Sequence, residues 1–215
     1  MNNTIKKIAS VTFALGTLAW ADAQKSDAKS KQILDAVANK YKANKNTYFK
    51  FAYGTGSQGK VSKTQTGIFY TTPSQYKLKI MGIEQLFDGQ KVYNISEEDQ
   101  EVTIAKANGN EMMFSPTNYL NSYKTNYNTQ YVGKRTLNGT STELIKLTPI
   151  KNNGIKNVFI FVDAAKNQLV KVEQYNSNND VAIIQIQDYR TNQNLAADLF
   201  RFNRDKYQNY VITEL

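Results

Sequence analysis

Residues 75–80 read QYKLKI, a strict alternation of polar and apolar side chains over the length of a β-strand. In a strand, Tyr76, Leu78 and Ile80 would point to one face of the sheet and the lysines between them to the other. One face is therefore expected to be apolar and the other to meet water, which is typical of antiparallel sheets. A second stretch, Phe49-Lys-Phe-Ala-Tyr53, repeats the pattern.

Short β-rich segments continue on both sides of these stretches. Ten strands are expected, at residues 48–53, 65–70, 75–81, 91–95, 102–105, 130–137, 142–148, 156–162, 169–175 and 181–189. Turn pairs that favour tight hairpins separate several of them: Asp88-Gly89, Asn108-Gly109, Asn138-Gly139 and Asn153-Gly154. Neighbouring strands are therefore predicted to be antiparallel. Residues 158–162, which read VFIFV, are apolar on both faces and predict cover on each side.

Two helices are expected beside the strands. An amphipathic stripe predicts one over residues 27–43, and Ser115-Pro116 followed by apolar residues at helical spacing predicts a short second one. Two helices cannot cover a flat sheet of ten strands, so its apolar face would be left bare. The expected fold is mainly β, of the α+β class: an incomplete antiparallel barrel with the helices as a lid over an apolar cavity.

The N-terminus has the layout of a secretory signal peptide. Lys6-Lys7 precede an apolar run over residues 8–20, and Ala21-Asp22-Ala23 fits a cleavage site. An anchoring helix is the alternative, but the run is shorter than the ~20 residues that a membrane span needs. We predict that residues 1–23 are removed, and that residues 24–215 form a single soluble, exported domain.

The composition argues against most catalytic and metal chemistry. The chain has no His and no Cys, so we expect no cofactor, no metal site and no enzyme activity. A dense acidic cluster could be a calcium or general-acid site, although a solvated hairpin loop is the favoured interpretation: Glu97, Glu98, Asp99 and Glu101. The formal net charge of +9 favours anionic membranes or acidic proteins as partners over nucleic acid.

Several motifs follow one another in a recognisable order. After the leader and the helix they are Gly67-Ile-Phe-Tyr70, Pro73, Tyr76-Lys-Leu-Lys-Ile80, Gln85-Leu-Phe-Asp-Gly89, Val92-Tyr93-Asn94, Leu147-Thr-Pro149, Phe159–Val162, Leu169-Val-Lys-Val-Glu173 and Leu199-Phe-Arg-Phe202. In this order and spacing the chain resembles the outer-membrane lipoprotein carrier family, LolA. The resemblance implies a monomeric carrier whose cavity takes the acyl chains of lipoproteins from an inner-membrane donor complex towards an outer-membrane acceptor.

The resemblance and the alternation together predict the ligand-binding residues. Those expected to line the acyl-chain cavity are Phe49, Phe51, Tyr53, Tyr70, Tyr76, Leu78, Ile80 and Leu86. Those expected on the lid are Ile33, Leu34, Val37, Tyr41, Tyr119 and Leu120.

One position departs from the family pattern. Well-studied members carry an Arg immediately before the Pro that corresponds to Pro73, and it ties the lid to the sheet; here the residue is Thr72. How the lid is controlled therefore stays open, as do the identities of cargo, donor and acceptor. The alternatives are a carrier of another lipid such as a glycolipid, a lipid-sensing envelope-stress module that passes its signal to a protein partner, and a hydrolase built on the acidic cluster.

Overall fold

The computed structural model of the 215-residue chain describes residues 27–107 and 117–215. The predicted leader, the Asn108-Gly109 turn and the Ser115-Pro116 helix start lie outside these ranges. The elements are, in chain order, α1 (Ala28–Ala43), β1 (Thr47–Ser57), β2 (Lys60–Thr71), β3 (Tyr76–Ile80), β4 (Ile83–Phe87), β5 (Lys91–Ser96), β6 (Glu101–Lys106), α2 (Asn118–Asn126), β7 (Tyr127–Leu137), β8 (Thr140–Pro149), β9 (Ile155–Asp163), β10 (Gln168–Asn176), β11 (Asp180–Thr191), a 3₁₀ helix η1 (Arg204–Tyr207) and β12 (Val211–Glu214).

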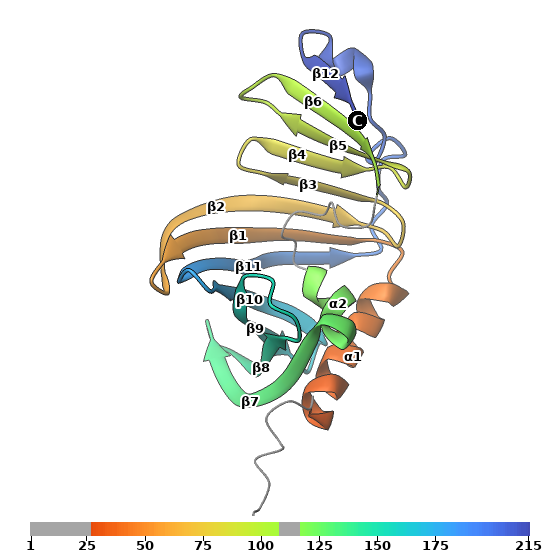
Figure 1. Cartoon of the computed structure of the whole chain (residues 1–215). Coiled ribbons are helices and arrows are strands. Elements are labelled where there is room, and N and C mark those ends of the chain that lie inside the picture. Colours follow the sequence, from red (N-terminus) through yellow and green to blue (C-terminus); the bar gives the residue numbers. More distant parts are fainter. Residues whose placement is uncertain (1–26, 108–116) are drawn as a thin grey trace, which may run out of the picture.

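The described strands form one twelve-stranded sheet in the order β12-β6-β5-β4-β3-β2-β1-β11-β10-β9-β8-β7. Consecutive strands from β1 to β6 and from β7 to β11 are antiparallel neighbours, and β11 returns to pair with β1. Within the described ranges β7 and β12 lie at opposite ends of the sheet, which is curved and open (Figure 1). The predicted incomplete antiparallel barrel is confirmed, apart from β12, which runs parallel to β6.

The sequence pattern missed two strands, β4 and β12. Met81 and Gly82 connect β3 to β4, and both have positive φ angles, 57° and 74°. This is the geometry of a two-residue hairpin, but Met is an unusual residue there, so the usual turn signal is missing. Strand β12 has only four residues and pairs with β6, which lies far away in the sequence. No local pattern marks such a pairing.

Both predicted helices form, and both pack on the same face of the sheet, called the inner face here (Figure 1). Helix α1 begins after Asp27, whose side chain accepts a hydrogen bond from the Ser30 amide at 2.7 Å. The apolar stripe of α1, including Leu34 and Val37, is buried against the strands together with α2. These contacts make the inner cluster, which draws on α1, α2, β1–β3 and β7–β11.

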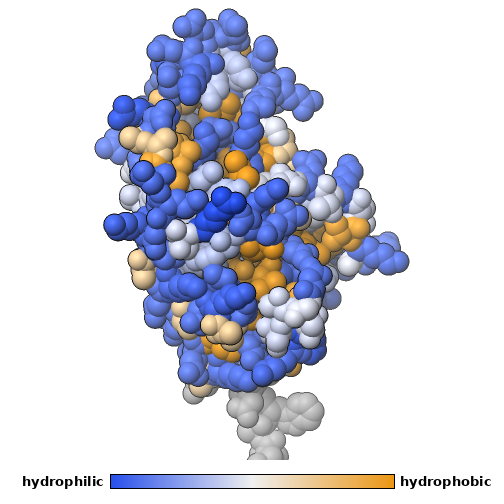
Figure 2. Space-filling model, turned by 180° about the vertical axis from the view of Figure 1, so that it is seen from behind, coloured by the Kyte–Doolittle hydropathy of each residue, from blue (hydrophilic) through white to orange (hydrophobic). Residues whose placement is uncertain are grey.

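A second cluster lies on the opposite, outer face of β4–β6. It consists of Leu86, Tyr93, Ile95, Val102 and Ile104, covered by Phe200, Phe202, Tyr207, Tyr210 and Ile212 of the C-terminal segment. This is the outer cluster. Seen from behind, the molecule is mostly hydrophilic, and hydrophobic side chains show through in separate patches (Figure 2).

The strand that is apolar on both faces, β9, needs no second layer of structure. Its Val158, Ile160 and Val162 belong to the inner cluster. On the outer face, Phe159 packs edge-on against Tyr175 with ring centroids 5.8 Å apart, and the Lys171 ammonium lies 5.7 Å from the Phe161 ring. The predicted cover is therefore present on both faces, and on the outer face side chains of the neighbouring strand β10 supply it.

Candidate functional site

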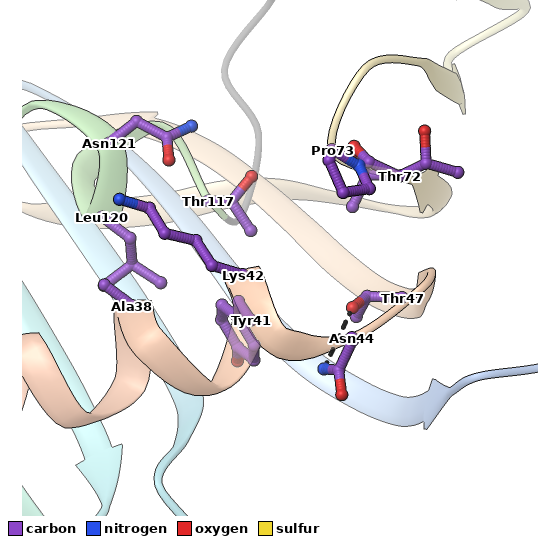
Figure 3. Close-up of a pocket in the computed structure, with 11 residues that line it drawn as sticks. Ala38, Tyr41, Lys42, Asn44, Thr47, Thr72, Pro73, Thr117, Leu120 and Asn121 are labelled. Atoms are coloured by element: carbon purple, nitrogen blue, oxygen red, sulfur yellow. Dashed lines mark hydrogen bonds between the residues drawn. The ribbon is translucent and has the colours of Figure 1, made fainter.

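Two adjoining pockets lie beside the connection between β2 and β3. One has a volume of about 370 Å³ and lies between this connection, the end of α1 and the start of α2 (Figure 3). The other has a volume of about 250 Å³ and lies between the same connection, β4 and β5. We call them the helix-side and the strand-side pocket. They share five lining residues, Thr71, Thr72, Pro73, Thr117 and Asn121.

The lining of these pockets is apolar on some walls and polar on others. Ala38, Tyr41 and Leu120 supply apolar surface in the helix-side pocket. Tyr76 and Phe87 do the same in the strand-side pocket. The remaining described residues that line them are mostly Thr, Asn, Ser and Gln, and none carries a carboxylate. Apolar walls with a few polar groups are typical of small-molecule sites, and the larger volume lies at the lower end of their range.

A row of aromatic rings connects the two pockets along the inner face. Tyr41 meets Phe49 at 5.7 Å between ring centroids, and Phe49 lies 6.1 Å from Phe69. Tyr76 follows at 6.1 Å and Phe87 at a further 5.5 Å. The row runs from α1 across β1, β2 and β3 to β4, so buried rings link the helix-side pocket, lined by Tyr41, to the strand-side pocket, lined by Tyr76 and Phe87.

Glycine shapes the neighbouring part of the inner face. A Cβ atom on Gly67 would lie 2.4 Å from the Phe51 ring, closer than real Cβ contacts allow. The missing side chain lets the Phe51 ring lie directly over β2, where it is fully buried. Any larger residue at Gly67 would push this ring into the inner cluster.

The lid helices are hydrogen-bonded to the half of the sheet that lies away from the pockets. The Tyr41 hydroxyl accepts a hydrogen bond from the Leu169 amide of β10 at 3.0 Å. The Tyr119 hydroxyl donates to Gln174, also on β10. Burial raises the pKa of both phenols, so both stay neutral and able to make these bonds at neutral pH.

Further contacts join α1 to α2 and to β7. The hydroxyl groups of Ser30 and Thr129 are 2.6 Å apart, which attaches the start of α1 to β7. Asp35 of α1 accepts a hydrogen bond from Tyr123 of α2 and pairs with Lys124 at 2.5 Å. The hydrogen bond from Lys124, and then that from Tyr123, lowers the pKa of Asp35 below its usual 3.8. The two helices are thus held as one unit.

Thr72 organises the connection between β2 and β3. Its hydroxyl oxygen accepts hydrogen bonds from the backbone amides of Gln75, at 2.9 Å, and Ser74, at 3.3 Å. Among the described residues, its hydrogen bonds stay within this connection and none reaches α1 or α2. Thr72 therefore shapes a wall of both pockets, and no hydrogen bond between described residues lets it tie the lid to the sheet.

The structure brings most of the predicted site residues together, although few of them line the pockets. Six of the eight predicted cavity residues lie in or against the inner cluster: Phe49, Phe51, Tyr53, Tyr76, Leu78 and Ile80. All six predicted lid residues also pack there: Ile33, Leu34, Val37, Tyr41, Tyr119 and Leu120. Of these twelve, Tyr41, Tyr76 and Leu120 line a pocket.

Two predicted cavity residues, Tyr70 and Leu86, lie on the outer face. Tyr70 pairs with Lys77 across the strands, and its ring lies 4.7 Å from that of Tyr48. Leu86 also pairs with Lys77 and belongs to the outer cluster. Their selection as cavity residues was wrong, because side chains alternate along a strand and their neighbours hold the inner positions.

The pocket residues that were not predicted from the sequence differ in whether a sequence pattern could have identified them. Phe87 pairs with Tyr76 and so shares its face, which continued alternation through β4 would have shown. The Thr and Asn residues of the lining come from segments far apart in the sequence, and no local pattern joins them.

The acidic cluster lies in the turn between β5 and β6, where it is exposed to solvent. Asp99 accepts a hydrogen bond from the Ser96 hydroxyl at 2.6 Å, and Glu97 pairs with Lys79 at 2.6 Å. Among the described residues, no three acidic side chains converge on a position for a metal ion. These carboxylates make local contacts of a solvated hairpin.

Comparison with known proteins identifies a family. The sequence model described as "Outer membrane lipoprotein carrier protein LolA" matches residues 54–203. No curated protein matches the sequence. Within residues 27–107 and 117–215, no helix is long and apolar enough to cross a membrane.

Solved structures share the fold at low sequence identity. An uncharacterized conserved protein from Thermus thermophilus has a TM-score of 0.61 and 10% identity, over 87% of this chain and 99% of the other. MucB gives 0.51 and 14%, over 82% of this chain and 64% of its own. The Mycobacterium tuberculosis lipoprotein LppX gives 0.50 and 12%, over 80% and 100%. These similarities concern the fold alone.

Proposed function

Because the chain belongs to the outer membrane lipoprotein carrier protein LolA family, we propose that it binds the acyl chains of lipoproteins between its two helices and the inner face. It would carry them through the periplasm from an inner-membrane donor complex towards an outer-membrane acceptor. The cargo leaves unchanged, so the protein acts as a carrier and not as an enzyme. Its partners are the acylated ligands and these two membrane components, with no part for nucleic acid.

The observation that carries this proposal is the aromatic row that joins the two pockets. Once the helices move away from it, this row would offer an apolar surface that reaches from Tyr41 on α1 to Phe87 on β4. Burial of one CH₂ group contributes ~0.8 kcal/mol, so a sixteen-carbon chain along this surface could gain on the order of 10 kcal/mol before costs. A membrane offers a similar gain per CH₂ group. A carrier that nearly matches the membrane can both take up and release its ligand.

Loading requires more space than the two pockets provide, because the inner cluster between them is closely packed. Phe49 and Phe69 are fully buried. Hydrogen bonds attach the lid to β7 and β10, whereas among the described residues none joins α1 or α2 to the β2–β3 connection. We therefore place the opening between the helices and the β2–β3 connection, with the β7–β10 side as the fixed end.

The test is mass spectrometry of organic extracts from protein purified from its native source. The variant Thr71→Trp places a large ring in both pockets, and Thr66→Trp, on the exposed part of the same strand, is its matched control. We expect acylated molecules in stoichiometric amount with the wild type and the control, intact in mass, and little with Thr71→Trp.

Protein that carries no lipid in all three preparations would contradict the carrier proposal. If such empty protein instead captured a membrane-tethered regulator, the lipid-sensing module would replace the carrier as the proposed function.

Cell fractionation and N-terminal sequencing test the predicted export: the protein should be periplasmic and begin at Gln24.

A further inference from the structure

Lys42 stands at the edge of the helix-side pocket and has no partner among the described residues. It lies in the last turn of α1 and lines this pocket together with Thr117 and Asn121 of the α2 region. Figure 3 shows its side chain extending from α1 towards α2. Within residues 27–107 and 117–215, no ion pair, hydrogen bond or ring contact involves its ammonium group.

Two neutral hydrogen-bonding groups stand beside this cation. The side chains of Thr117 and Asn121 make no hydrogen bond with other described residues, although Thr117 is only 9% exposed. None of the described residues that line either pocket is acidic. An ammonium, a hydroxyl and an amide therefore face a pocket whose inner walls are apolar, with no carboxylate in its described lining to neutralise the charge.

The position of Lys42 at a helix end suggests a simpler, purely structural role for this residue. Basic residues in a last turn stabilise a helix by offsetting its dipole. Lys40 occupies the same turn, but its ammonium group already donates to the carbonyl oxygen of Lys166 at 2.5 Å. A purely structural lysine at position 42 would affect folding stability and would not distinguish one ligand from another. This difference makes the two explanations separable.

We propose that Lys42, with Thr117 and Asn121, forms a subsite for an anionic head group, a phosphate or a carboxylate, of the acylated ligand. The inference rests on the proposed function, because the acyl chain must occupy the apolar wall for its head to reach this edge. The protein would then prefer acyl ligands with an anionic head over those with an uncharged head of equal chain length. Exposed charge pairs are weak, so the preference is about fivefold.

The experiment compares two single-chain probes with the same palmitoyl chain, lysophosphatidylglycerol and monopalmitoylglycerol, by isothermal titration below their critical micelle concentrations. Glycerol 3-phosphate serves as the anionic head without the chain. The variants are Lys42→Met, which removes the charge, Lys42→Arg, which keeps it, and Lys45→Met, which removes a nearby exposed charge that does not line either pocket. Urea midpoints check that all variants fold.

The proposal predicts that the wild type binds the anionic lipid about fivefold more tightly than the neutral one. Lys42→Met should abolish this preference by weakening anionic binding alone, while Lys42→Arg and Lys45→Met keep it. Equal binding of the two lipids by the wild type, or an equal loss of both in Lys42→Met, would overturn the subsite and leave the carrier proposal standing. If glycerol 3-phosphate bound as tightly as lysophosphatidylglycerol, the acyl chain would add nothing to binding, and this would overturn a subsite that acts together with an acyl-chain site. Absence of binding to either lipid would overturn both proposals.

Discussion

Helices α1 and α2 cover the inner cluster, whereas the C-terminal segment covers the outer cluster. In the outer cluster the rings stack closely: Phe202 lies 4.6 Å from Tyr93 and 5.3 Å from Tyr207 between centroids. In the inner cluster the helices are hydrogen-bonded to β7 and β10, and two pockets adjoin their other side. The same sheet thus supports stacked rings under the C-terminal segment on one face, and a cover of two helices with two pockets beside it on the other.

The largest effect should come from a charge placed in the middle of the inner cluster. Leu78 is 1% exposed, so Leu78→Asp should cost roughly 4–5 kcal/mol and leave little folded protein. It therefore tests folding and is unsuited to testing binding. Lys79→Asp, on the other face of the same strand, is the control and should stay folded. Circular dichroism with urea titration measures both, and a stably folded Leu78→Asp would contradict the packing of the inner cluster.

The next effect separates the two clusters. Phe202→Ala removes the ring between Tyr93 and Tyr207 and should lower the free energy of unfolding by about 2–3 kcal/mol. The affinity of the folded fraction for an acyl ligand should not change, because the ring lies on the outer face. Phe202→Tyr keeps the ring and serves as control. A loss of affinity in folded Phe202→Ala would show that the outer cluster takes part in binding.

A smaller effect concerns the attachment of the lid. Tyr41→Phe removes the hydroxyl that accepts from the Leu169 amide and should cost about 1–2 kcal/mol, because a largely buried amide loses its partner. Hydrogen exchange of the Leu169 amide should become faster in the variant. The exchange of amides on β5 and β6 should stay as in the wild type. An equal change there would show that these strands and the strands under the lid do not unfold independently.

The smallest effect is a pH dependence at the contact between the helices. The pKa of Asp35 is lower in the folded protein than its usual 3.8, so its stabilising contribution is present above that value and is lost as the pH falls through the folded value. Because the side chain is partly exposed, Asp35→Asn should cost only about 0.5 kcal/mol at neutral pH. Urea midpoints from pH 6 to 2 should fall less steeply in the variant. If the urea midpoints of the wild type and the variant fell in parallel, the assignment of this pH dependence to Asp35 would be contradicted.

Alternation along strands was the part of the fold that the sequence revealed best. It identified Phe49, Phe51, Tyr76, Leu78 and Ile80 as one face, and all five belong to the inner cluster. The period of 3.6 residues similarly identified the buried stripe of α1. Both are local properties, set by how a strand or a helix repeats, so they can be read without knowledge of the partner elements.

The features that the sequence could not reveal depend on contacts between distant segments. Tyr70 and Leu86 were placed in the cavity by residue type and family motif, although their register puts them on the outer face. The outer cluster forms only when Phe202 reaches β5. The pockets combine Lys42, Thr72 and other residues of separate elements, and only the folded chain brings these together.

The central claim, that acyl chains lie along the inner face and not against the outer cluster, can be tested by fluorescence quenching. The chain has one tryptophan, Trp20, so a Trp20→Phe background contains none. In that background Phe87→Trp places a reporter in the strand-side pocket and Phe202→Trp places one in the outer cluster. A brominated palmitoyl ligand should quench the Phe87→Trp protein at saturation and leave the Phe202→Trp protein unquenched. Quenching of Phe202→Trp alone, or of both equally, would contradict the account.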